Sequence, residues 1–298
     1  MALVDLPRDA PSLVPVQNSA RPVLSKTTNE TQFSRDLSWA ISSPPLLNLG
    51  DADSFPPLLT TDIDIARLSF FMSERKEHRV GHYFENLVHF WLKHIRNVEI
   101  IDHRRQVRDE DRTVGEIDFV FRDEAARLVH WETAIKFYLR TPALDDAIPR
   151  YLGPNTADSL ERKIAHLRDH QLPLSTRVHG QIDIHHAFVK GRIYQHPSDK
   201  AVTEGPNELA PGHLRGIWIH ECELAALIET QAATSPRFTI LNKPFWLTRT
   251  DESISGTEFA RTVAKHFTQS PNSLHIAAYN RDQKETDRLF VVANGWPN

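Results

Sequence analysis

The sequence predicts an α/β fold, with a mixed central sheet flanked by helices and a β-rich C-terminal extension. Three strand-like runs follow a long helical region, at 98–102, 114–122 and 127–138. A helix is predicted next, near 156–170, because Leu160, Ile164 and Leu167 recur at helical spacing. A helix, a hairpin with an adjoining strand and a second helix form the skeleton of a small α/β core.

Three segments are expected along the chain. Residues 1–30 contain four prolines and little periodicity, so they are predicted to form a disordered tail. Residues 31–172 are expected to hold the α/β core with its N-terminal helices. Residues 173–298 carry short β-like runs and two helical stretches, and we expect them to pack on the same sheet. The runs lie near 181–194, 216–221, 237–241, 274–279 and 287–293, and the helical stretches near 222–231 and 256–267.

The N-terminal helices of the core are predicted at two places. Ser34 is expected to cap a short helix over 35–41, which the following prolines end. A long helical region over 62–96 is expected to break near Gly81, and its second half carries one apolar stripe. Glu85 lies at the edge of that stripe, so we expect its carboxylate at the border of the buried face.

Composition and charge exclude several classes of protein. The chain has 298 residues and a formal net charge of −4, so a nucleic-acid surface would have to be a local basic patch. Its single cysteine, Cys222, excludes an internal disulfide and a thiolate zinc cage. No apolar run approaches the roughly 20 residues that span a bilayer, and no secretory signal pattern is present. We therefore expect no membrane partner and a cytoplasmic location.

Carboxylates interrupt two strands that are otherwise rich in aromatic residues. Period-two alternation places Glu116, Asp118 and Val120 on one face of the first strand. The same alternation places His130, Glu132, Ala134 and Lys136 on one face of the second. If the strands are neighbours, Asp118 and Glu132 lie side by side, and a divalent cation would remove their mutual repulsion.

This pattern predicts metal-dependent phosphate chemistry. Hard oxygen ligands suit Mg²⁺ or Mn²⁺, which would polarise a phosphate and lower the pKa of an attacking water. Asp118 and Glu132 would hold the metal, and Lys136 would steady the phosphate. The expected reaction is hydrolysis of a phosphodiester.

Three further residues are candidate substrate contacts, each with a simpler structural alternative. His130 shares the Glu132 face, but it can equally be a packed, hydrogen-bonded histidine. Asn155 follows Gly153-Pro154 and is most simply part of a loop that leads into a helix. Lys163 lies on that helix, where a solvated face would also explain it.

These acidic residues resemble the pattern of the PD-(D/E)xK nuclease superfamily. Glu85, within Gly81-His82-Tyr83-Phe84-Glu85, matches the helical acid of that superfamily, and Asp118 matches its strand Asp. Glu132 matches its second acid and Lys136 its lysine. The resemblance implies a restriction-endonuclease-like core at about 62–172 and a Mg²⁺-dependent nuclease, in which Glu85 would position the metal or a water. The substrate implied is a nucleic-acid phosphodiester, with DNA and RNA both open.

A second resemblance extends from about residue 34 to the end of the chain. It is to a bacterial family, domain-of-unknown-function family 1853. The matching stretches are Arg35-Asp36-Leu37-Ser38-Trp39, Ser43-Pro44-Pro45-Leu46-Leu47, His130-Trp131-Glu132, Lys136-Phe137-Tyr138-Leu139, Gly153-Pro154-Asn155, His170-Gln171-Leu172-Pro173-Leu174 and His213-Leu214-Arg215-Gly216. No activity comes with this family, so the nuclease expectation rests on the superfamily alone.

The lysine departs from the superfamily pattern. That pattern places Lys two residues after the second acid, where this chain has Ala134. Lys136 lies four residues after Glu132, roughly 13 Å away at about 3.3 Å per residue. Two alternatives therefore stay open: an inactive nuclease-fold protein that binds or scaffolds, and an interaction protein that uses aromatic residues of the C-terminal half.

Other chemistries lack their sequence patterns. The 16 histidines include no His-Glu-x-x-His spacing, and His220-Glu221-Cys222-Glu223 has no second element at ligand spacing. The sequence also lacks a Gly-x-x-x-x-Gly-Lys phosphate loop, a Gly-x-Gly-x-x-Gly dinucleotide motif and a Gly-x-Ser-x-Gly elbow. Zinc chemistry of the usual kinds, P-loop hydrolysis, dinucleotide binding and serine esterase activity are therefore not predicted.

Overall fold

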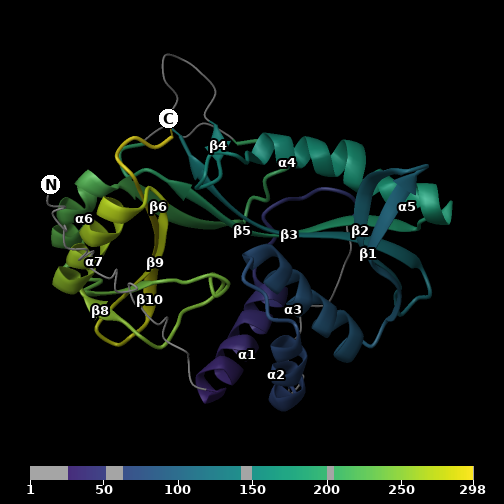
Figure 1. Ribbon diagram of the computed structural model, residues 1–298, viewed down its shortest axis with the longest axis horizontal. Helices are drawn as coiled ribbons and strands as arrows, with labels where there is room; N and C mark the ends of the chain where they lie inside the picture. Colours follow the sequence, from purple (N-terminus) through teal and green to yellow (C-terminus); the bar gives the residue numbers. More distant parts are fainter. Residues whose placement is uncertain (1–25, 52–62, 142–149, 200–204, 298) are drawn as a thin grey trace, which may run out of the picture.

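A single mixed sheet with helices on both faces forms the core of the protein (Figure 1). The computed structural model describes residues 26–51, 63–141, 150–199 and 205–297. Within them, the sheet has ten strands and includes strands from both predicted halves of the chain. The predicted α/β class, with a mixed central sheet flanked by helices, is therefore confirmed.

The elements have the following bounds. The strands are β1 (Glu99–Asp109), β2 (Arg112–Arg122), β3 (Leu128–Arg140), β4 (Tyr151–Leu152), β5 (Ile184–Gln195), β6 (Leu214–His220), β7 (Arg237–Ile240), β8 (Ile254–Ser255), β9 (Leu274–Tyr279) and β10 (Glu285–Val292). The helices are α1 (Lys26–Ser42), α2 (Ile65–Glu74), α3 (Val80–His94), α4 (Leu160–His166), α5 (Leu172–His179), α6 (Leu224–Gln231) and α7 (Gly256–Gln269). Two short segments, a π-helical turn η1 (Leu167–Gln171) and a 3₁₀ turn η2 (Glu221–Glu223), adjoin them.

The strand order is β1-β2-β3-β5-β6-β10-β9-β7-β8, with β4 paired to β3. The strands β3, β5, β6 and β10 are parallel to their neighbours in this series, and the outer pairs are antiparallel. The parallel crossover from β3 to β5 passes through α4, η1 and α5. That crossover places a helical layer over the face of β2 and β3 that carries the candidate carboxylates.

Hydrophobic clusters on both faces hold the layers together. On one face, aromatic residues of β2, β3 and β5 pack against α1, α2 and α3, and Trp131 stacks on Phe188 at 4.6 Å. On the other face, Leu160 and Ile164 of α4 pack against β3 and β5, and Leu174 of α5 packs against β2. Helices α6 and α7 pack against β6, β7, β9 and β10, in the part of the sheet formed by the C-terminal strands.

Several element boundaries differ from the sequence prediction. Ser34 is not a helix cap, because α1 begins at Lys26 and Ser34 lies inside it. Residues 26–30, which were predicted to belong to the disordered tail, are therefore part of this helix. Residues 1–25 lie outside the described part of the chain. The break in the second helical region falls between Glu74 and Val80, before Gly81.

Two predicted elements continue further than the sequence pattern indicates. Strand β1 extends to Asp109 and forms a long hairpin with β2, although its second half is polar and largely exposed. The helical layer continues through Pro173, since α5 begins at Leu172 and proline is tolerated in the first turn of a helix. No helix in the described residues is long and apolar enough to cross a membrane.

Candidate functional site

The two carboxylate-bearing strands separate at the position of Asp118 and Glu132. Strands β2 and β3 pair from Arg122↔Leu128 to Phe119↔Trp131, and the next pair in this register would be Asp118 with Glu132. The ladder ends there, although β2 continues with β1 and β3 continues with β5. We call this position the fork. It brings the two predicted acids together at the place where the sheet opens.

Side chains replace the missing backbone ladder at the fork. The Thr133 amide donates to Asp118 Oδ2 at 2.7 Å, and the Thr133 hydroxyl donates to the same oxygen at 3.0 Å. The Asp118 amide lies 3.5 Å from Glu132 Oε1. Each acid thus accepts from a backbone amide of the opposite strand. This exchange fixes both carboxylates while leaving Asp118 Oδ1 without a hydrogen-bond partner among the described residues.

Both carboxyl groups resist ionisation. Burial raises the pKa of Asp118 to about 8, and the charge of Glu132 adds to the rise. Burial also raises the pKa of Glu132 to about 8, although Lys163 acts in the opposite direction. Two buried acids at one place therefore hold protons near neutral pH, and a bound cation would displace them.

Glu85 does not complete a compact triad with these two acids. Arg104 donates to its carboxylate at 2.6 and 3.0 Å, and His103 Nε2 lies 3.1 Å from Oε1. Burial would raise the pKa of Glu85, but the hydrogen bonds from His103 and Arg104 outweigh it and lower the pKa. Within the described residues, the acids of the fork form no group of three ligand atoms within 4.8 Å. The structure therefore does not bring Glu85 together with the two acids at one point, although its charge raises the pKa of both.

Arg104 is placed by an unusual backbone conformation. Its φ is +52°, a left-handed value that residues other than glycine rarely adopt. The register of the β1–β2 hairpin places Arg104 of β1 opposite Asp118 of β2. The conformation interrupts the regular strand beside the fork and allows the guanidinium to reach Glu85. Local backbone strain of this kind often accompanies functional sites.

His130 supports Glu132 from inside the protein. Its side chain is fully buried, with Nε2 at 2.9 Å from Glu132 Oε1 and Nδ1 at 2.8 Å from Ser175 Oγ. Burial lowers the pKa of His130 to about 4, so the ring is neutral at pH 7. These contacts fit the structural alternative given above for His130, a packed and hydrogen-bonded histidine. A fully buried ring does not contact a substrate.

Lys136 and Lys163 occupy different places relative to the fork. The Lys136 ammonium donates to Asp158 Oδ2 at 2.7 Å, and the Tyr138 hydroxyl donates to the same oxygen at 3.2 Å. The Lys163 ammonium donates to Gln171 Oε1 at 2.7 Å. Burial lowers the pKa of Lys163, and Lys136 adds to that effect. Lys163 of α4 is thus connected to Glu132 through one intervening side chain, that of Gln171.

Gln171 makes that connection. Its amide nitrogen donates to Glu132 Oε2 at 2.5 Å, while its amide oxygen accepts from Lys163. Gln171 ends the π-helical turn η1, and such turns recur at functional sites because they redirect side chains within a helix. The series Lys163–Gln171–Glu132–His130–Ser175 therefore runs continuously from the surface of α4 into the core.

The remaining candidate, Asn155, lies outside this series. It is exposed in the turn between β4 and α4, and its backbone carbonyl accepts from the Ala157 amide. Glu116, which shares the strand face of Asp118, is exposed, and its charge raises the pKa of Glu132. Neither residue is linked by a hydrogen bond to the two acids in the described part of the chain.

Sequence reasoning missed four residues of this site. Gln171 lies in the stretch His170-Gln171-Leu172-Pro173-Leu174, so the family resemblance offered a signal for it. Thr133 directly follows Glu132, but nothing in its spacing indicates a bond to Asp118. His103 and Arg104 lie in a polar part of β1 that has no strand periodicity. Their contact with Glu85 depends on the folded hairpin.

Comparison with known proteins identifies the family. The chain matches the model of the family described as "Domain of unknown function (DUF1853)" over residues 35–292, and it belongs to that family. No curated protein and no solved structure matches the chain. The match spans both the fork and the C-terminal strands, so the two parts belong to one family unit.

Proposed function

We propose that this protein is a metal-dependent nuclease that hydrolyses nucleic-acid phosphodiester bonds. The observation that carries the proposal is the fork, where Asp118 and Glu132 meet with pKa values raised to about 8. A protein that only needed a stable sheet would gain more from apolar residues at this place, since buried carboxyl groups destabilise a fold. Perturbed acids at an opening of the sheet are typical of functional sites.

The order of elements supports a restriction-endonuclease-like core. Helix α3 precedes three antiparallel strands, a helical crossover follows, and β5 then pairs parallel to β3. This is the helix, hairpin, strand and helix skeleton that the superfamily resemblance implies. Asp118 and Glu132 lie at its centre, as that resemblance requires of a strand acid and a second acid.

The donor set fits Mg²⁺ or Mn²⁺, which take carboxylate oxygens and water. Asp118 and Glu132 would hold such an ion, which when bound polarises the phosphate and acidifies water. Thr133 and His130 orient the two carboxylates, and Glu85 adds negative charge from α3. A proton must leave each of the two acids on metal binding, so we expect affinity to fall by up to about 100-fold for each pH unit below 8.

The position of the lysines favours Lys163 over Lys136 as the group that binds the phosphate. The Lys136 charge is neutralised by Asp158, whereas Lys163 reaches the acids through the flexible amide of Gln171. A phosphate at the fork can displace Gln171 and accept directly from Lys163. This assigns to Lys163 the role that the sequence pattern gave to Lys136.

Cleavage assays test the proposal. The full chain is incubated with labelled single- and double-stranded DNA and RNA in Mg²⁺, Mn²⁺ or chelator. We expect metal-dependent cleavage that falls by at least about 10³-fold in Asp118→Asn and in Glu132→Gln. Glu229→Gln, at an exposed position of α6, is the matched control and should keep full activity. Cleavage that survives Asp118→Asn would remove the fork from the mechanism.

Mn²⁺ titration distinguishes the proposed nuclease from the main alternative. If the chain neither cleaves nor binds Mn²⁺ in a manner dependent on Asp118 and Glu132, it is an inactive nuclease-fold protein that binds or scaffolds. The displacement of Lys136 onto Asp158 is the observation that favours this alternative. The interaction reading based on C-terminal aromatics has less support: the exposed large hydrophobic residues of the described chain are Ile65, Phe70, Ile101 and Val114.

A further inference from the structure

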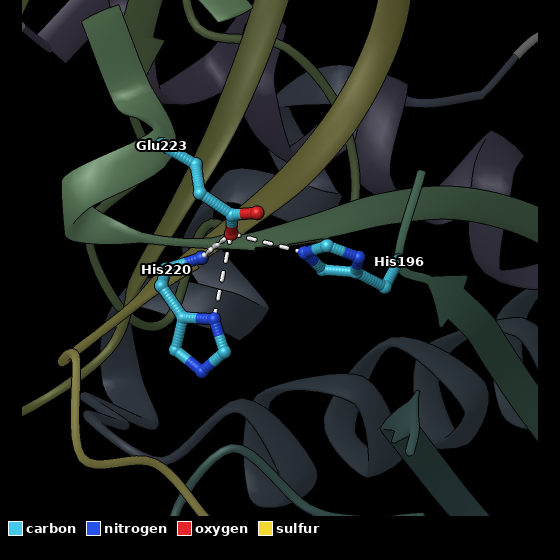
Figure 2. Close-up of side chains that lie close together, drawn as sticks. All are labelled: His196, His220 and Glu223. Atoms are coloured by element: carbon cyan, nitrogen blue, oxygen red, sulfur yellow. Dashed lines mark hydrogen bonds and ion pairs between the residues drawn. The ribbon is translucent and has the colours of Figure 1, made fainter. Parts of the chain in front are cut away.

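Two histidines and a glutamate meet at the carboxyl ends of two parallel strands. His196 directly follows β5, His220 is the last residue of β6, and Glu223 ends the turn η2 (Figure 2). Strands β5 and β6 are parallel neighbours, with Gln195 opposite Ile217. The carboxyl ends of parallel strands are favoured places for binding sites, because chain ends and loops gather there.

This histidine cluster (His196, His220 and Glu223) is far from the fork. Glu132 pairs with Ala187 on β5, and His196 lies nine residues further along the chain. At about 3.3 Å per residue the two places are roughly 30 Å apart. A ligand at the histidine cluster would therefore be independent of one held by Asp118 and Glu132.

The ligand atoms converge on one carboxylate oxygen. Glu223 Oε2 lies 2.9 Å from His196 Nε2 and 3.4 Å from His220 Nδ1 (Figure 2). All three ligand atoms lie within 4.8 Å of one another. In a tetrahedral zinc site, nitrogen and oxygen ligands at about 2.0–2.1 Å from the metal lie roughly 3.3 Å apart. Small side-chain adjustments would therefore open room for an ion.

The other nitrogen of each imidazole already has a partner. His220 Nε2 lies 3.0 Å from the Trp296 carbonyl oxygen, which can only accept, so Nε2 carries a proton and Nδ1 has the lone pair. In the metal-free protein the His220 side chain uses that lone pair to accept from the Glu223 amide, and a bound ion would replace this bond. His196 Nδ1 lies 2.7 Å from the Ser198 hydroxyl and accepts from the Ser198 amide at 3.3 Å, so in the metal-free protein Nε2 carries the proton and donates to Glu223 Oε2. A bound ion would take the place of that proton. Partners of this kind fix the orientation of metal-binding histidines.

Aromatic residues enclose the cluster on the protein side. Trp218 lies 4.7 Å from the His196 ring and 5.1 Å from the His220 ring, and Trp296 packs on Trp218 at 4.9 Å. Trp218 is buried, whereas the Glu223 side chain is 39% exposed. One side of the cluster is thus apolar and closed to solvent, and the other is open, so that an ion and a water could enter.

We propose that His196, His220 and Glu223 form a binding site for a divalent transition-metal ion, with Zn²⁺ as the type. Two imidazoles and one carboxylate are a known donor set for zinc with an open fourth position. The sequence could not indicate this site, because His220 and Glu223 lack a second element at ligand spacing along the chain. The end of β5 supplies that element in the fold.

A capping interaction is the competing explanation for the same contacts. Glu223 Oε2 accepts from the His220 amide at 2.8 Å, and the two residues form a capping box around η2. This interaction accounts for His220 and Glu223 but does not require His196, which approaches from a different strand. Substitution of His196 therefore distinguishes a metal site from a cap.

Calorimetric titration with Zn²⁺ tests the proposal on the full chain after treatment with chelator. We expect one equivalent of Zn²⁺ to bind, with affinity at least about tenfold weaker in His196→Gln and in Glu223→Gln. The Glu223→Gln amide oxygen can still accept the capping bond, so that variant should fold. Zn²⁺ should also raise the Tm of the unsubstituted chain by more than it raises the Tm of either variant.

Three control variants localise the ion. Cys222→Ser alters an exposed neighbour of the cluster, Glu221→Gln alters a half-buried one, and Asp118→Asn alters the fork. All three variants should still bind Zn²⁺ at the histidine cluster. The proposal is overturned if the unsubstituted chain binds no Zn²⁺, if His196→Gln binds it as tightly, or if Cys222→Ser loses it.

Discussion

The two edges of β3 behave differently along the same strand. Its β5 edge is paired without interruption from Val129↔Ile184 to Arg140↔Gln195. Its other edge is paired with β2 only from Leu128 to Trp131, opens at the fork, and is paired again with β4 at Leu139 and Arg140. The closed edge excludes side chains from the space between the strands, whereas the open edge admits two carboxylates and their hydrogen-bond partners.

The difference shows how one sheet can be both rigid and chemically useful. Gly191 on the closed edge has φ +147°, and an added Cβ would lie 1.8 Å from the Lys136 carbonyl oxygen. The absence of a side chain at Gly191 therefore allows β5 to lie close against β3 at Lys136. Asp118 and Glu132 can then be held in place although their own strands have separated.

The largest expected effect comes from filling the closed edge. Gly191→Ala should destabilise the protein by about 3 kcal/mol or more, because both the backbone conformation and the close carbonyl oppose a Cβ. Denaturant unfolding measures the loss. Gly81→Ala is the control, since no atom lies within 4 Å of its added Cβ and alanine favours a helix. An equal loss in both variants would contradict the comparison.

At the open edge, the two lysines should differ in their effect on cleavage. Lys163→Met should lower kcat/KM by about 10²-fold, as expected for removal of one donor to a developing charge. Lys136→Met should lower it by less than about tenfold, because Asp158 already neutralises that ammonium. Steady-state kinetics of both variants measure the ratio. The reverse order would return the phosphate-binding role to Lys136.

The acids at the fork should make stability depend on pH. The folded pKa of Asp118, about 8, lies above its ordinary value of 3.8, so stability falls as pH rises from about 4 to 8. Asp118→Asn removes the contribution of Asp118 while Glu132 keeps its own, and it should stabilise the metal-free chain at pH 8 by about 2 kcal/mol. Unfolding at pH 4 and pH 8 checks the sign, and the gain should vanish at pH 4.

Metal provides the control for that measurement. Saturating Mg²⁺ should stabilise the unsubstituted chain at pH 8 and leave Asp118→Asn unchanged, because only the former keeps both carboxylates. A gain that persists at pH 4 would show that the substitution acts through packing. That result would contradict the assigned charge repulsion.

The smallest expected effect concerns the ion pair beside the fork. Arg104→Ala and Arg104→Gly both remove the partner of Glu85, but only glycine tolerates φ +52° without strain. Arg104→Ala should therefore be less stable than Arg104→Gly by about 1 kcal/mol. Thermal unfolding of the pair measures the difference. Equal stability would mean that the chain relaxes this backbone conformation in the variants.

Much of the sheet was predictable because its strands carry strong patterns. Aromatic and β-branched residues alternate through β2 and β3, and the structure places strands there with ends close to those predicted. The second half of β1 escaped prediction because it is largely exposed and polar, with Val107 as its one buried residue. Helix α5 escaped because Pro173 indicates a helix end, although a proline within the first turn costs little.

The candidate site was predictable only in part. Asp118 and Glu132 stand out because charges are rare in aromatic-rich strands, and the structure brings them together at the fork. Their supports could not be found in this way. Gln171 and Arg104 come from other elements, and their contacts depend on a π-helical turn and on one left-handed residue.

The sequence by itself determined the fold class and the pair of acids, since both follow from local periodicity and from the rarity of buried charge. Only the tertiary structure decided which lysine faces the acids, how Glu85 is held and which histidines meet. The physical reason is distance along the chain. Lys163, Arg104 and His196 reach their partners through a crossover, a kinked hairpin and a pair of parallel strand ends. Folding creates these proximities, and spacing in the sequence does not record them.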